Sequence, residues 1–165
     1  MASTPFATVA CPVRRMICIS GFFALIALRA WIPSISGILI SSNTTSNNCS
    51  FNTSMADSPD GPWAKAAENP VLVTSRDPNK FDSFRADDSC LIARGGKVWL
   101  YYKGRQWERT PRQTQMGLAI AETPTGPFTR ANDGDPVQDS GHEVLVWPHG
   151  EGVMSHVSNT GPHGR

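Results

Sequence analysis

Two carboxylates stand at matching positions of two similar segments. Asp88 begins one segment and Glu143 begins the other. Each is followed by a short apolar stretch, a glycine turn at Gly95 or Gly150, and a second stretch of strand-forming residues. If the two segments are equivalent strands of one architecture, both side chains converge on a shared centre. Paired carboxylates at one centre can divide general acid and general base roles between them.

A second internal repeat predicts the architecture around these segments. The sequence of residues 56–66 recurs at 121–131, and nine of the eleven positions are identical or chemically conservative. Both copies read A-[DE]-[ST]-P-x-G-P-[WF]-x-[KR]-A, in which Pro and Gly set a tight turn and an aromatic residue begins a new strand. Residue types predict strands over four ranges: 88–93, 97–103, 115–121 and 127–131.

Four-stranded units that recur with a period of about 40–65 residues and close on a turn are typical of a β-propeller. An antiparallel sandwich with similar hairpins is the alternative. We therefore predict an all-β fold without a helix longer than two turns. It is a partial β-propeller, with one complete four-stranded blade, parts of two neighbours and a non-propeller apolar N-terminal segment.

The predicted blade resembles a known group of enzymes. The motif Gly96-Lys97-Val98-Trp99-Leu100-Tyr101-Tyr102 after Asp88, followed by the Pro-x-Gly-Pro-aromatic turn, resembles the five-bladed propeller glycoside hydrolases of the arabinanase, xylosidase and fructosidase groups. Gly141-His142-Glu143-Val144 with Gly152-Val153 is similar to one branch, the α-1,3-neoagarooligosaccharide hydrolases. The resemblance covers about residues 55–165. It implies hydrolysis of O-glycosidic bonds in an oligosaccharide or polysaccharide. We predict no cofactor and no metal ion.

The resemblance also implies roles for individual residues. Hydrolysis of a glycosidic bond needs one group that activates water or attacks, and an acid that protonates the leaving oxygen. Asp88 is then the auxiliary carboxylate that tunes a pKa and holds a sugar hydroxyl, and Glu143, or His142 beside it, is the proton donor. The residues alone leave two alternatives open: Asp88 caps a turn, and Glu143 is an exposed charge at a strand end.

Three further residues are assigned to substrate binding: Arg85, Asp87 and Trp107. The alternative for Trp107 is that it lies in a solvated hairpin loop and does not stack on a sugar.

The N-terminal third differs in kind from the rest. Arg14-Arg15 precedes an uncharged run over 16–28, as in a secretory signal peptide. A membrane anchor within 16–40, and an upstream stretch foreign to the protein, are alternatives. We predict a signal-like or anchor segment over 1–40, a disordered Ser/Asn-rich linker over 41–55 and the propeller domain over 56–165. A secreted or periplasmic protein is expected, with a membrane-anchored one as the alternative.

Composition excludes several other classes. A net charge of +1 and 18% charged residues argue against a nucleic-acid binder that works through bulk positive charge. The 14 glycines and 13 prolines argue against a coiled coil. The four cysteines form no C-x-x-C pair, which argues against a zinc site.

One departure from the resembled family affects function. The family's catalytic base is an Asp in the first blade, but no acidic residue precedes Asp57. Five blades of about 60 residues also need about 300 residues. We therefore expect a truncated, inactive fragment of a glycoside hydrolase. A non-catalytic carbohydrate-binding propeller module and a membrane-anchored interaction protein are the alternatives.

Overall fold

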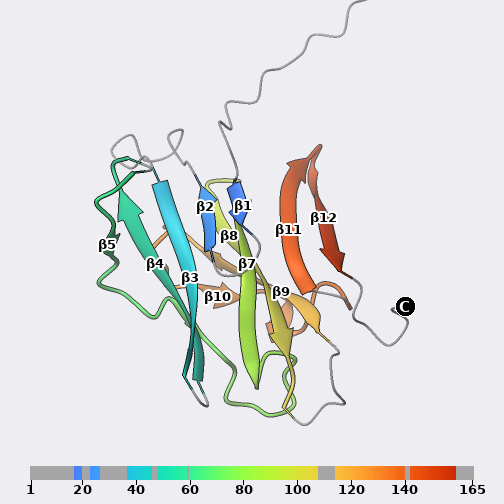
Figure 1. Cartoon of the computed structure of the whole chain (residues 1–165). Helices are drawn as coiled ribbons and strands as arrows, with labels where there is room; N and C mark the ends of the chain where they lie inside the picture. The colour runs from blue at the N-terminus through green and yellow to red at the C-terminus, as the bar shows by residue number, and fades with distance from the viewer. Residues whose placement is uncertain are drawn as a thin grey trace, which may run out of the picture.

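Three antiparallel sheets, one after another along the chain, make up the described part of the computed structural model (Figure 1). The structure describes residues 17–19, 23–26, 37–45, 48–58, 60–107, 114–139 and 142–158. Within these residues the sheets are open and do not close into a ring.

The first sheet has the strand order β1-β2-β3-β4-β5, and β6 also pairs with β4. Its strands are β1 (Ile17–Ile19), β2 (Phe23–Ile26), β3 (Gly37–Thr45), β4 (Asn48–Ala56), β5 (Ala64–Lys65) and β6 (Leu72–Val73).

The second sheet is a complete four-stranded unit in the order β10-β9-β8-β7. Its strands are β7 (Arg85–Arg94), β8 (Lys97–Arg105), β9 (Gln115–Ala121) and β10 (Thr129–Arg130). The third sheet is the hairpin of β11 (His142–His149) and β12 (Gly152–Ser158). A single 3₁₀ turn, η1 (Asn132–Gly134), is the helical content of the described residues. The predicted all-β fold with one complete blade between two partial ones is confirmed.

The two copies of the turn motif have equivalent strand pairings as well as similar sequences. Ala64 of β5 pairs with Met55 of β4, and Thr129 of β10 pairs with Ile120 of β9. Met55 and Ile120 are as many residues apart as the two copies of the motif, and so are Ala64 and Thr129. The last two strands of successive sheets therefore share one register.

The turns that precede these short strands also match. The N–H of Gly61 donates to the carbonyl of Ser58 at 2.9 Å, and that of Gly126 to the carbonyl of Thr123 at 3.0 Å. The φ angles of the two glycines are +86° and +81°, in the left-handed region that glycine adopts without steric cost. The repeated Gly-Pro motif thus codes for one repeated turn.

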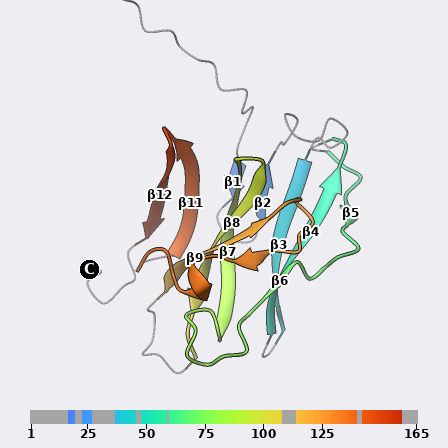
Figure 2. The same cartoon turned by 180° about the vertical axis from the view of Figure 1, so that it is seen from behind.

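The first strands of the second and third sheets, β7 and β11, lie next to each other, and the first sheet lies on the other side of β7. β7 contacts β11 on one side and β2 and β4 on the other, as Figure 1 and the reverse view in Figure 2 show. This is the arrangement of neighbouring blades around a propeller axis.

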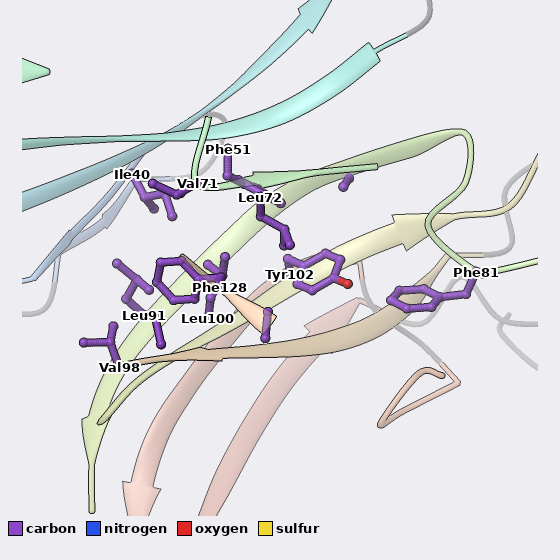
Figure 3. Packing of buried hydrophobic residues seen from close by; sticks show 13 residues of the cluster. Ile40, Phe51, Val71, Leu72, Phe81, Leu91, Val98, Leu100, Tyr102 and Phe128 are labelled. Atoms are coloured by element: carbon purple, nitrogen blue, oxygen red, sulfur yellow. The ribbon is translucent and has the colours of Figure 1, made fainter. Parts of the chain in front are cut away.

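Both faces of the second sheet are buried, which explains its near-continuous apolar strands. One face packs on the first sheet (Figure 3), through residues that include Ile40, Phe51, Leu91, Leu100 and Tyr102. The other face packs on the third sheet, through residues that include Cys90, Ile92, Tyr101, Leu118 and Val146. Alternate residues of β7, β8 and β9 serve opposite faces because the side-chain period of a strand is two.

Phe81 fills space that two glycines leave open. A Cβ added to Gly104 would lie 2.2 Å from the Phe81 ring, and one added to Gly117 would lie 2.3 Å from it. These glycines are needed for close approach, and not for a turn.

The expectation of a disordered linker over 41–55 is wrong for the residues described there. β3 and β4 pair without a break from Gly37 and Ala56 to Thr45 and Asn48. The reason is a buried alternation, at Cys49, Phe51 and Thr53, within the polar composition.

The described residues of the apolar N-terminal segment form β1, β2 and the beginning of β3 in the first sheet. In the described part of the chain, no helix has the length and apolar character to span a membrane. The assignment of a signal or anchor to residues 1–40 stays a prediction.

Candidate functional site

Asp88 occupies a β-bulge near the start of β7. Asp87 pairs with Lys103 and Ser89 pairs with Tyr102, so Asp88 is an extra residue of β7 at this point of the ladder. Its φ is +41°, in a region that few residues other than glycine adopt. A bulge bends its strand and redirects a side chain, and such features recur beside active sites.

Four charged side chains gather around this bulge. The Lys103 Nζ lies 2.5 Å from Asp88 Oδ2 and 2.8 Å from Asp87 Oδ1. The Arg85 Nε donates to the other oxygen of Asp87. Two carboxylates are thus balanced by two cations. We call Arg85, Asp87, Asp88 and Lys103 the charged cluster.

Burial separates the two carboxylates of the charged cluster. The side chain of Asp87 is 4% exposed, whereas that of Asp88 is 23% exposed. Asp87 therefore acts as an internal counter-charge for Arg85 and Lys103, because a buried carboxylate needs such partners. Asp88 is the carboxylate that a ligand can reach. Lys103 orients it from the protein side through a charge-assisted hydrogen bond.

β11 has an irregularity at the position equivalent to Asp88. His142 pairs with Ser158 and Leu145 pairs with His156, so β11 contains one extra residue between them. Glu143, the counterpart of Asp88 in the sequence, lies in this bulge. The hairpins that follow also match, since Arg94 pairs with Lys97 across one and His149 pairs with Gly152 across the other.

The two bulges stand on adjacent first strands, because β7 lies against β11. The side chain of Glu143 lies outside the described residues, and so does Gly141 of the Gly-His-Glu-Val motif. The His142 side chain is half-buried. The structure thus brings Arg85, Asp87 and Asp88 into one cluster and puts the backbone of the predicted proton donors on the neighbouring strand.

Trp107 lies just beyond the end of β8 and is 46% exposed. Its ring contacts Phe84, at a centroid distance of 5.0 Å and an interplanar angle of 62°. Sequence reasoning missed Phe84 and also Lys103. The available signal for Lys103 was a lysine that directly follows the apolar run 98–102 of β8, opposite Asp87 in the hairpin.

No cation site is evident near the carboxylates. Among the residues that the structure describes, no three His, Cys, Asp or Glu side chains are grouped so that they could hold a metal ion.

Comparison with known proteins gives matches among solved structures. No protein-family model and no curated protein matches the chain. A family 117 glycoside hydrolase from the marine bacterium Zobellia galactanivorans is 32% identical, with a TM-score of 0.62 over 72% of this chain and 35% of that one. The chain has a propeller glycoside hydrolase fold. The resemblance inferred from the motifs is confirmed.

Two family 43 structures agree with this glycoside hydrolase fold. A β-xylosidase/α-arabinofuranosidase from a compost metagenome, in complex with xylotriose, has a TM-score of 0.59 at 13% identity, over 81% of this chain and 41% of that one. A family 43 enzyme from Xanthomonas citri has a TM-score of 0.55 at 17% identity, over 74% of this chain and 35% of that one. This propeller glycoside hydrolase-like chain therefore spans about two fifths or less of the length of these solved relatives.

Proposed function

We propose that the chain is a glycoside hydrolase-type domain that binds an oligosaccharide at the bulged starts of β7 and β11. The observation that carries the proposal is that both first strands bulge at the same position, at Asp88 and at Glu143. Asp88 holds a sugar hydroxyl, and Glu143 or His142 occupies the place of the acid that protonates the leaving oxygen in a complete hydrolase.

The remaining predicted residues take supporting roles in this proposal. Arg85 is partly exposed and donates hydrogen bonds to the saccharide from the rim of the site. Asp87 acts through Arg85 and Lys103, because it is buried between them. Trp107 offers an aromatic surface for a sugar ring.

A second candidate, a carbohydrate-binding module without turnover, is favoured by one observation. Residues 1–56 contain no carboxylate, so β1 to β4 supply no catalytic base to the site. Inverting and retaining hydrolysis both need a carboxylate that activates water or attacks the sugar. We propose that this chain alone holds a saccharide without cleaving it.

Calorimetric titration of the whole chain with neoagarotetraose and with xylotriose tests the site. We expect binding of at least one saccharide, and Asp88→Asn should weaken it by about tenfold to a hundredfold, since a hydrogen bond to a charged group contributes about 1.5–3 kcal/mol. Asp135→Asn is the matched control, because Asp135 is exposed and pairs with Lys80, which is not a member of the charged cluster. Equal affinities of the chain and Asp88→Asn would contradict the proposed site.

Reducing-sugar release from the same saccharides separates the two candidates. Binding without release is expected. Release that Asp88→Asn abolishes would show a complete hydrolase and would contradict the proposal that the chain lacks turnover.

A further inference from the structure

Two large aromatic rings lie side by side on the surface near the charged cluster. Phe84 is 39% exposed and Trp107 is 46% exposed. The rings contact each other edge to face, and the Arg105 guanidinium carbon lies 5.4 Å from the centroid of Phe84. We call Phe84, Trp107 and Arg105 the aromatic platform. Single exposed apolar residues are common, but two adjoining rings form a patch of the kind that marks binding sites.

The backbone under the aromatic platform is held in place by hydrogen bonds. The Phe84 N–H donates to the Arg105 carbonyl at 3.0 Å, and the Trp107 N–H donates to Ser83 Oγ at 3.0 Å. Ser83 Oγ in turn lies 3.2 Å from the Pro78 carbonyl. Because these bonds fix both ring-bearing residues, a ligand that stacks on them incurs little ordering cost.

The aromatic platform adjoins the charged cluster. Phe84 directly precedes Arg85, and Arg85 pairs with Arg105 across the β7–β8 ladder. Asp88 is the fourth residue after Phe84, at a distance of about 13 Å of extended strand or less. One oligosaccharide can therefore span both features.

We propose that the aromatic platform is a second saccharide subsite, on which a pyranose ring stacks while its neighbour occupies the Asp88 site. The proposal rests on the proposed function for the identity of the ligand. Sugar rings present C–H faces that suit aromatic surfaces and hydroxyls at their edges. Arg105 offers guanidinium donors to such hydroxyls. Sites of this kind combine aromatic rings with a few polar groups.

Binding of neoagarotetraose and xylotriose to platform variants tests the proposal. We expect Phe84→Ala and Trp107→Ala each to weaken binding by about threefold to tenfold, in line with one lost aromatic contact. Trp107→Phe keeps an aromatic ring and should restore most of the affinity. Met154→Ala is the control, because Met154 is similarly exposed but belongs to β12 of the third sheet.

A second measurement distinguishes a loss of binding from a loss of folding in these variants. The indole N–H signal of Trp107, identified in the proton–nitrogen spectrum by its loss in Trp107→Phe, should shift on addition of saccharide. Unchanged melting temperatures of the variants would assign the loss to binding.

The outcomes for the platform and for the Asp88 site are distinct. Weakening by Asp88→Asn but not by Phe84→Ala or Trp107→Ala overturns the platform alone. The reverse pattern overturns the Asp88 site and supports the platform. No measurable binding of either saccharide overturns both.

Discussion

Lys103 and Asp87 stand opposite each other in the β7–β8 ladder, and the Lys103 Nζ lies 2.8 Å from Asp87 Oδ1. Both side chains are less than a tenth exposed. Removal of one partner from a buried ion pair leaves an uncompensated charge, which is costly. The same ammonium contacts Asp88, so this pair joins the stability of the sheet to the geometry of the candidate site.

We predict that Lys103→Met lowers the free energy of unfolding by about 3 kcal/mol, the lower end for a broken buried pair because Arg85 still contacts Asp87. Urea denaturation of the chain measures this value. Lys97→Met removes an exposed pair with Glu122 and should cost less than about 1 kcal/mol. Similar losses for the two variants would argue against a structural role for the charged cluster.

Asp82 joins the loop after β6 to the second sheet. It is fully buried, accepts a hydrogen bond from the Tyr102 hydroxyl at 3.0 Å and is paired with Arg130 at 2.6 Å. Asp82→Asn should cost about 2–3 kcal/mol, reduced from the fully buried case because Arg130 is partly exposed. Asp135→Asn, at an exposed pair, should cost less than about 1 kcal/mol. Denaturation midpoints that do not differ would refute this prediction.

Gly117→Ala should destabilise the chain by about 1–3 kcal/mol, because its Cβ would lie 2.3 Å from Phe81 and 2.7 Å from Tyr102. The comparison is Gly152→Ala in β12, where the nearest atom is the His149 carbonyl oxygen at 3.7 Å. That variant should stay within about 0.5 kcal/mol of the parent. A well-tolerated Gly117→Ala would show that Phe81 does not pack against this glycine.

Alkaline pH should weaken the fold through Tyr102. Burial, with the nearby Asp82 charge, raises the pKa of the Tyr102 hydroxyl above its ordinary value of 10.0. Above about pH 10 the unfolded chain has lost this proton and the folded chain has kept it. The unfolded state then binds fewer protons, so stability falls as pH rises from there, whereas below about pH 10 the contribution is complete.

The matched variant for this pH dependence is Tyr102→Phe. It should cost about 1 kcal/mol at neutral pH, through the lost hydrogen bond to Asp82, and should flatten the decline above about pH 10. Urea denaturation at several pH values measures both. An equally steep alkaline decline in Tyr102→Phe would assign the effect to other groups.

The second sheet was predictable because its signals are local. Strand-forming residues and the Gly95-Gly96 turn gave β7 and β8 within a few residues, and the two repeats gave the matching registers. The first sheet was missed because a Ser/Asn-rich composition hid the alternation of Cys49, Phe51 and Thr53, which only burial against the second sheet reveals.

The site was predictable in position but not in chemistry. The matched segments placed Asp88 and Glu143 at equivalent strand starts, whereas nothing local to Asp88 signals a left-handed residue in a bulge. Lys103 joins the site because of its cross-strand partner, and Phe84 because of the Trp107 ring, which is distant from it in sequence. Such contacts depend on tertiary structure, so residue types alone did not indicate them.

The central claim is that a saccharide binds at the bulged starts of β7 and β11. Backbone amide shifts of the isotope-labelled chain, recorded while neoagarotetraose or xylotriose is added, test it most directly. We predict the largest shifts at residues 87–89 and 142–144, with none at the hairpin turns of Gly95 and Gly150. Shifts confined to those turns, or no shifts with either saccharide, would contradict the account.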